Sequence, residues 1–168
     1  KKSERNEYEI TDAITSLAKN SDIHCVKAKL WIPIGYPWDL LKADRILRGN
    51  NNLIGREAEI YGNVKNSTIG NGCIIYGSVK NSIIMDNSFV GKKSIVEDSV
   101  IGENVHFEGS ISAKNYSYSI VNGKRINAGR LGAIIADNVV AENVIINSGC
   151  KIWPNKKISN KTIKEDLL

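Results

Sequence analysis

The sequence contains no apolar run long enough to cross a membrane. No window of its 168 residues approaches the roughly 18 consecutive apolar residues that a spanning helix requires. The opening stretch Lys1–Arg5 has no apolar segment behind it, so we expect neither a signal peptide nor a membrane partner. Because the chain also starts without Met, we expect a fragment of a longer cytoplasmic protein.

Cysteine and histidine are too few and too scattered to predict a metal site. The three cysteines, Cys25, Cys73 and Cys150, match no metal-binding spacing. His24 and His106 have no clustered ligands, so no zinc or other metal is expected. Cys73 and Cys150 fall in columns otherwise held by inward apolar residues, where a thiol behaves as a small hydrophobe. We therefore expect both to be buried and reduced.

The charge is also too weak and too dispersed to indicate a nucleic-acid partner. The net charge is +5, and the lysines are spread along the chain. Neither an aromatic-plus-basic motif nor a groove-reading helix is present, so we expect no nucleic-acid binding. Anionic small molecules are compatible with this charge. Apolar content of 42% with 24% charged residues is ordinary for a folded protein.

What the sequence does contain is an internal repeat between Ile60 and Phe107. Its columns recur first after 15 residues and then after 17: Val64, Val79 and Val96; Ser67, Ser82 and Ser99; Ile69, Ile84 and Ile101. A short, nearly fixed period is typical of a stacked repeat architecture.

Within the repeat, apolar residues recur near every sixth position and are often followed by glycine, as in Ile69-Gly70 and Val90-Gly91. This period is incompatible with a long helix, and the β-branched content favours strands. Triplets of such hexads build the hexapeptide-repeat parallel β-helix. We therefore predict a mainly β solenoid with stacked inward Ile and Val, Gly or Asn at the corners, and a ladder of serines.

Two stretches depart from the repeat. Before it, residues 1–49 are predicted as a small α/β segment: a helix at Glu7–Lys19, a strand at Ile23–Leu30, a loop at Trp31–Pro37 and a helix from Trp38 to near Arg48. These elements are too few to bury a core of their own. The β-helix is predicted over 50–158, and 159–168 is a charged tail.

The second departure is an insertion at 108–130. Tyr116–Val121 followed by Asn122-Gly123 predicts a β-hairpin, because Asn-Gly fits a tight turn. A loop that leaves a rigid solenoid is a usual place for function.

Two sets of stretches resemble a known enzyme family. Ser3–Ala13 with Trp31–Leu41 looks like the end of a sugar-1-phosphate nucleotidylyltransferase domain, in which Glu7 would be the sugar-contacting glutamate. The other set resembles the left-handed β-helix acetyltransferase domain of bifunctional sugar-phosphate enzymes, in particular the archaeal type: Asn81–Ser88, Asp98–Val105, Gly123–Arg125 and Leu131–Ile135.

The resemblance implies ligands and an assembly. Such enzymes acetylate an amino-sugar 1-phosphate and transfer a nucleotide to it. It therefore implies a sugar 1-phosphate, acetyl-CoA as co-substrate and a homotrimer formed through the β-helix, in nucleotide-sugar biosynthesis. The glycine-rich nucleotide loop of the family is absent from this sequence, so nucleotide transfer and its Mg²⁺ would belong to an N-terminal domain.

The resemblance also locates a site. The family's catalytic His and the Tyr three residues later are replaced by Lys92 and Ile95, while Asn115 stands where the family has its asparagine. The His acts as a base, which a protonated lysine cannot do. Basic residues could hold phosphate groups or could equally line a solvated face: Lys92, Lys93, Lys114, Lys124, Arg125 and Arg130. Two functions stay open: acetyl transfer, or a non-catalytic β-helix that trimerises and assembles or regulates the nucleotidylyltransferase.

Overall fold

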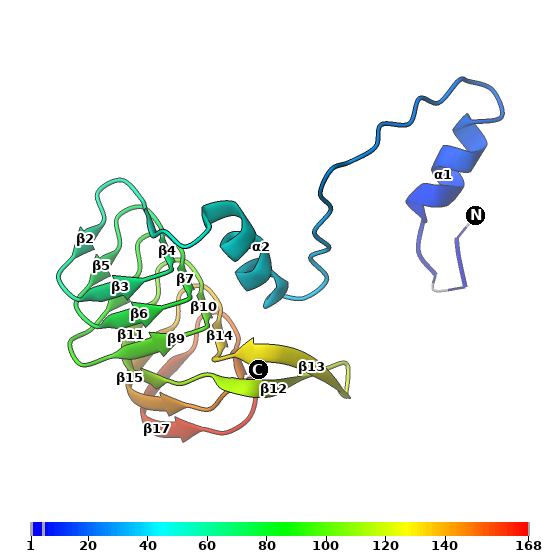
Figure 1. Cartoon of the computed structure of the whole chain (residues 1–168). Helices are drawn as coiled ribbons and strands as arrows, with labels where there is room; N and C mark the ends of the chain where they lie inside the picture. Colours follow the sequence, from blue (N-terminus) through cyan, green and yellow to red (C-terminus); the bar gives the residue numbers. More distant parts are fainter. Residues whose placement is uncertain (1, 5, 168) are drawn as a thin grey trace. The chain divides into compact units, whose positions relative to one another are not determined.

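The computed structural model describes residues 2–4 and 6–167 and divides the chain into two compact units, 1–32 and 33–168 (Figure 1). The first unit contains one helix, α1 (Ile10–Leu17), inside the range predicted as helical. The predicted strand at Ile23–Leu30 is wrong: its backbone is irregular, because no described stretch of the chain pairs with it. Across the described ranges, neither helix is long and apolar enough to span a membrane.

The second unit contains the helix α2 (Asp39–Arg48) and a long series of strands. The strands are β1 (Leu53–Ile54), β2 (Glu59–Ile60), β3 (Asn63–Lys65), β4 (Thr68–Ile69), β5 (Ile74–Ile75), β6 (Ser78–Lys80), β7 (Ile83–Ile84), β8 (Phe89–Val90), β9 (Ile95–Glu97), β10 (Val100–Ile101), β11 (His106–Ile111), β12 (Lys114–Val121), β13 (Lys124–Leu131), β14 (Ile134–Ile135), β15 (Val140–Ile146), β16 (Lys151–Ile152) and β17 (Lys157–Ile163).

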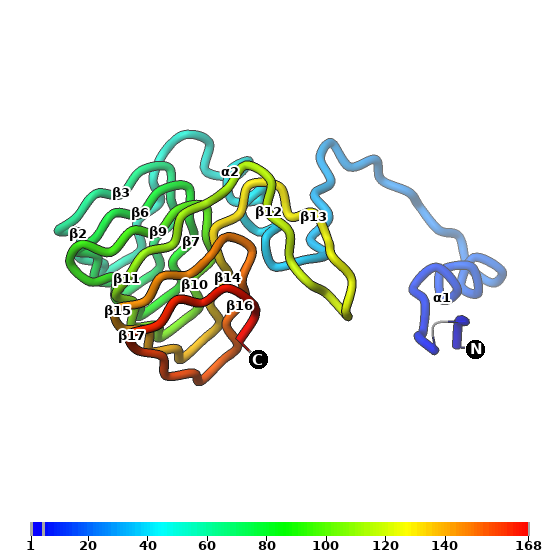
Figure 2. The backbone as a smooth tube through the Cα atoms, turned by 90° about the horizontal axis from the view of Figure 1, so that it is seen from below, coloured from blue at the N-terminus to red at the C-terminus, as the bar shows by residue number. Residues whose placement is uncertain are grey.

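These strands stack as the coils of a parallel β-helix, which confirms the predicted fold (Figure 2). The first face has the order β1-β4-β7-β10-β14-β16. The second is formed by β2, β5 and β8, and the third by β3, β6 and β9. From β11 onward, single long strands run across both of these faces, with an irregularity between Phe107 and Gly109.

The inward columns form the main core. Each coil of the first face places its isoleucine on the isoleucine of the next coil: Ile69, Ile84, Ile101, Ile135 and Ile152 are all buried. Cys73 and Cys150 are buried in the same core, as predicted, whereas Cys25 in the first unit is exposed. Stacking identical β-branched side chains lets consecutive coils pack without voids.

A buried ladder of serines accompanies the isoleucines, also as predicted. The Ser82 amide donates to Ser67 Oγ at 3.1 Å, and the Ser99 amide donates to Ser82 Oγ at 3.1 Å. The Ala133 amide continues the ladder with a 3.0 Å bond to Ser99 Oγ. Each of the three hydroxyls also donates to the carbonyl two residues earlier. One side chain thus satisfies two buried backbone groups of adjacent coils.

A second, smaller core lies outside the β-helix, against its first face. Trp38 and Leu41 of the α2 region pack there with Val100, Leu131 and Ile134. The hairpin contributes Val121 and Ile126 to the same cluster. α2 therefore packs on the repeat, and together with the hairpin it lies against part of the first face (Figure 1).

The hairpin predicted after Tyr116 is confirmed. β12 and β13 pair antiparallel, and Val121 lies opposite Lys124. Asn122 and Gly123 form the two-residue turn with φ of 48° and 73°. Positive φ at both positions is the requirement of the tight turns that favour Asn-Gly.

The serine ladder leads to a test of stability. We expect Ser82→Ala to lower the free energy of unfolding by about 1–3 kcal/mol, because it leaves the buried Ser99 amide without its acceptor. Urea denaturation measures the loss. The exposed Ser112→Ala is the matched control and should change stability by less than about 0.5 kcal/mol. Equal effects of both substitutions would contradict a structural role for the ladder.

Candidate functional site

The position of the family's catalytic His lies at the corner between β8 and β9. Lys92 and Lys93 are both exposed there. The Lys92 ammonium lies 5.5 Å from the centroid of the Tyr76 ring, a cation–π contact. Ile95 is 42% exposed and lines a shallow groove of about 410 Å³ with Lys93 and Asn63. The corner thus presents positive charge and apolar surface, and neither Lys92 nor Ile95 offers a proton acceptor.

An aromatic column follows the same side of the β-helix. The rings of Tyr61 and Tyr76 stack at 4.8 Å, and those of Phe89 and His106 stack at 4.6 Å. His106 Nε2 lies 3.5 Å from Glu108 Oε1. A neutral imidazole has one ring nitrogen that can act as an acceptor.

Two of the predicted site residues, Asn115 and Arg130, are in direct contact. Arg130 Nη1 donates to Asn115 Oδ1 at 2.7 Å, and Arg130 Nε donates to Asp98 Oδ2 at 2.8 Å. Asp98 is only 1% exposed, and Arg45 of α2 lies 4.0 Å from its other oxygen. Asn115 therefore uses its acceptor to hold the arginine that ties the hairpin to the β-helix. Sequence reasoning missed Asp98 as the centre of this cluster, although it places a charge in a column where Asn66 and Asn81 recur.

The other predicted cations lie elsewhere on the chain. Lys124 and Arg125 begin β13 at the hairpin turn, and the Arg125 guanidinium stacks 3.9 Å from the Tyr118 ring centroid. Lys114 is exposed at the start of β12, where its backbone amide donates to Ser148 Oγ at 3.3 Å. Glu7 belongs to the first unit, so its sugar contact stays a prediction.

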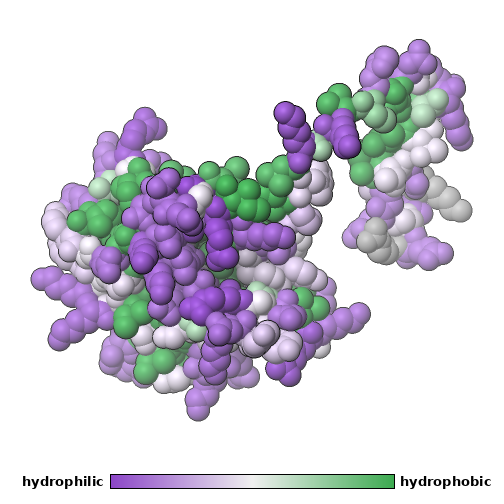
Figure 3. Space-filling view, in the orientation of Figure 1, coloured by the Kyte–Doolittle hydropathy of each residue, from purple (hydrophilic) through white to green (hydrophobic). Residues whose placement is uncertain are grey.

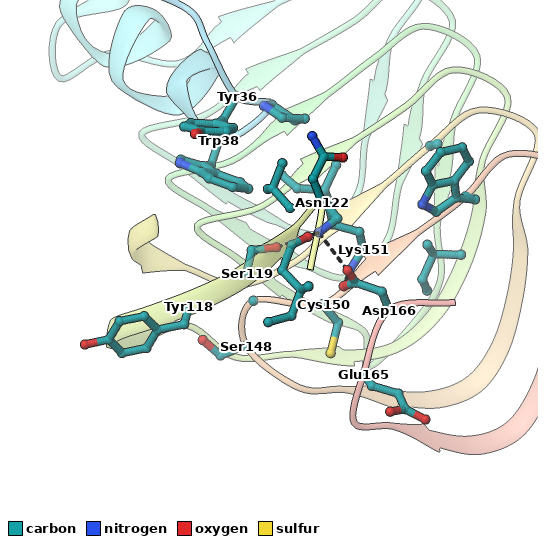
Figure 4. A pocket seen from close by; sticks show the side chains of 18 of the residues that line it. Tyr36, Trp38, Tyr118, Ser119, Asn122, Ser148, Cys150, Lys151, Glu165 and Asp166 are labelled. Carbon is teal, nitrogen blue, oxygen red and sulfur yellow. Dashed lines mark hydrogen bonds and ion pairs between the residues drawn. The ribbon is translucent and has the colours of Figure 1, made fainter. Parts of the chain in front are cut away.

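A cleft of about 1000 Å³ opens beside the hairpin (Figure 4). Five stretches line it: the residues before α2, the turn end of the hairpin, β14 with Ala136, the β16 region with Trp153, and the segment 164–166. The rings of Tyr36 and Trp38 stack in parallel at 4.7 Å on one wall. Sequence reasoning missed this cleft, because its walls come from stretches that are far apart along the chain.

Lys151 joins two walls of the cleft. Its Nζ donates to Ser119 Oγ at 2.8 Å and to the Ile120 carbonyl, and it lies 2.7 Å from Asp166 Oδ2 (Figure 4). The Lys151 amide also donates to Asp166 Oδ1 at 2.8 Å. Because an ammonium has three N–H donors, Lys151 has none left for a ligand.

The buried thiols are poor nucleophiles. Burial raises the pKa of the Cys150 thiol to about 11, and burial also raises the pKa of the Cys73 thiol. Both thiols stay protonated at neutral pH, and the thiolate is the reactive form. Within the described part of the chain, no three His, Cys, Asp or Glu side chains gather as metal ligands.

Comparisons with known proteins give a consistent picture. Residues 44–168 match the family model described as the GMPPB C-terminal domain. The chain is 37% identical over 98% of its length to the "Bifunctional protein GlmU" of Methanococcus maripaludis strain S2, covering 52% of that protein. It is 31% identical over 91% of its length to the protein of the same name from Methanocaldococcus jannaschii, covering 50% of it.

A third relative has a more explicit name. The "Bifunctional sugar-1-phosphate nucleotidylyltransferase/acetyltransferase" of Sulfurisphaera tokodaii is 29% identical over 93% of this chain, which covers 52% of that protein. The chain thus spans about half the length of the curated relatives it matches.

Thiol reactivity checks the placement of the cysteines. At pH 8 we expect a single thiol per chain to react within seconds with dithiobis(nitrobenzoate), because only Cys25 is exposed. The Cys25→Ser variant should lose this rapid phase, and denaturant should release the other two thiols. Rapid reaction of Cys25→Ser in the native state would contradict the burial of Cys73 and Cys150.

The Asp98 cluster leads to a second test. We expect Asp98→Asn to lower the free energy of unfolding by about 1–2 kcal/mol and to speed hydrogen exchange in β12 and β13. Arg130 would lose its buried charged partner, while Asn tolerates the φ of 44° at this corner. The neighbouring Glu97→Gln is the matched control. Unchanged hairpin exchange in Asp98→Asn would show that this ion pair does not hold the hairpin.

Proposed function

Because this chain belongs to the GMPPB C-terminal domain family, we propose that it is the C-terminal part of a sugar-1-phosphate nucleotidylyltransferase of nucleotide-sugar biosynthesis. The printed name of the Sulfurisphaera tokodaii relative supports this parent activity. So does the sequence resemblance of Ser3–Ala13 and Trp31–Leu41 to the end of a nucleotidylyltransferase domain. Nucleotide transfer, with its Mg²⁺, would belong to a domain that carries the glycine-rich loop.

The apolar surface of the first unit supports the same proposal. Ile10 of α1 is 74% exposed, and Ile14 and Leu17 on the same helix are exposed as well. Figure 3 shows apolar surface, in green, on this unit. An amphipathic helix with its apolar stripe in solvent is typical of an element that packs against another domain. In the proposed parent enzyme, the nucleotidylyltransferase domain covers this stripe.

The β-helix itself is proposed to be a non-catalytic module that trimerises and presents that domain. One observation carries this choice: at the position of the family's base, an exposed Lys92 ammonium faces the Tyr76 ring. An ammonium donates hydrogen bonds and accepts none. Ile95 stands where the family has its Tyr, and Asn115 Oδ1 already accepts a hydrogen bond from Arg130. Association through the β-helix is supported by the aromatic column, in which Tyr61 is 62% exposed.

Acetyl transfer from acetyl-CoA to an amino-sugar 1-phosphate is the second candidate. It is favoured by Asn115 at the family's position and by the exposed cations Lys92 and Lys93, which could hold phosphate groups. A different base would be required. His106 beside Glu108 is the group that the structure offers for this role.

A thiol-release assay with light scattering decides between the two. The chain is incubated with acetyl-CoA and either glucosamine-1-phosphate or galactosamine-1-phosphate. We expect no thiol release above the sugar-free background, and a scattering mass of three chains. Turnover that is lost in Asn115→Ala or His106→Ala, but kept in the exposed control Asn147→Ala, would establish acetyl transfer instead. A monomer in solution would overturn the assembly role.

A further inference from the structure

The cleft beside the hairpin is distinct from the corner at Lys92. The residues that line the two share no member, and the cleft lies on the first face of the β-helix, where α2 and the hairpin also pack. None of the residues predicted to bind acetyl-CoA or phosphate lines it. Its volume of about 1000 Å³ suits a small organic ligand.

Aromatic side chains stand at two places in the lining of the cleft. Tyr36 and Trp38 stack on each other on one side, with an interplanar angle of 14° (Figure 4). Trp153 is 53% exposed at another edge. Ile134 and Ile152 add apolar surface between them. Flat aromatic side chains at the edge of a cleft favour a planar ring, because ring faces stack.

The hairpin wall is fixed before any ligand arrives. A Cβ on Gly149 would lie 2.2 Å from the Tyr118 carbonyl oxygen, so the two backbones meet at a distance that only glycine permits. Lys151 clamps Ser119 and Ile120 of β12 to the C-terminal segment. Walls held by such contacts need little ordering on binding, which favours affinity.

The polar groups of the cleft indicate an uncharged ligand. Lys151 is neutralised by Asp166, and the exposed Lys164 is followed by Glu165, so charges of the two signs are equal in number along the lining. The Asn122 side chain lies over the cleft, and it makes no hydrogen bond with any residue that the structure describes (Figure 4). A carboxamide offers a donor and an acceptor side by side, the pattern that pairs with the edge of a heterocyclic base.

We propose that this cleft binds the heterocyclic base of a nucleoside, either free or as part of a larger metabolite. The ring packs against the aromatic walls, and Asn122 bonds to its edge. The inference uses the cleft alone and is independent of the parent activity and of acetyl transfer.

Calorimetric titration of the chain with adenosine, guanosine, cytidine and uridine tests the proposal. We expect at least one nucleoside to bind at one site per chain with a Kd below about 1 mM. Trp153→Ala should weaken binding at least about fivefold through lost stacking. Its control is Trp31→Ala, an exposed tryptophan outside the cleft that should change nothing.

A second pair of variants tests the polar contact. Asn122→Asp keeps the Asn-Gly type of turn but removes the amide donors, and it should weaken binding about fivefold. Asn127→Asp makes the same change on the hairpin outside the cleft and should leave the Kd unchanged. Circular dichroism confirms that each variant is folded.

Larger ligands identify the source of the base. Uridine diphosphate glucose and coenzyme A are titrated beside the free nucleosides. Binding of a nucleoside together with tighter binding of one of these compounds supports the proposal and names the metabolite. Binding of the phosphorylated compounds alone would overturn it, because phosphate and not the base would then be recognised. Absence of saturable binding by every nucleoside would also overturn it.

Discussion

Consecutive coils of this β-helix are held in register by hydrogen bonds of buried backbone groups, which must find their partners inside the protein. Each serine of the ladder links its own coil to the next, so the bonds at Ser67, Ser82 and Ser99 fix the stacking of the isoleucines beside them. A change in coil length is tolerated only at a corner, where the chain leaves the ladder. The step from 15 to 17 residues falls at the corner from Gly91 to Ser94, between the pairs Val90–Ile75 and Val96–Val79. Lys92 lies in this lengthened corner.

The parts of the fold that depend on local or periodic chemistry could be predicted from the sequence. The columns of isoleucine, valine and serine specify the β-helix, because each of these residues stacks on the residue of the same type in the next coil. Asn122-Gly123 specifies the hairpin through its two positive φ angles. The stretch Ile23–Leu30 shows the limit of such reasoning. Its alternating pattern is compatible with a strand, but a strand requires a partner, and none of the described residues provides one.

The candidate sites were less accessible to sequence reasoning, because they depend on how the hairpin and α2 dock. The resemblance located Asn115 and Arg130 but could not show that they bond to each other and, through Asp98, to the β-helix. The cleft could not be predicted from the sequence for the same reason. The cleft exists only because both α2 and the hairpin pack against the first face. This packing brings Tyr36, Asn122 and Trp153 into the lining of one cleft. A repeat pattern predicts the contacts within an inward column. It does not predict which segments pack on the outside of the β-helix.

Side chains on the surface of the solenoid can change without disturbing its inward columns. The side chains of Lys92 and Ile95 are exposed, so neither of them occupies an inward column. The most direct test of this account compares thiol release from acetyl-CoA by the unchanged chain and by the Lys92→His, Ile95→Tyr double variant, with glucosamine-1-phosphate as acceptor. We expect background release by the unchanged chain and release above background by the double variant. Equal turnover by the two proteins would contradict it.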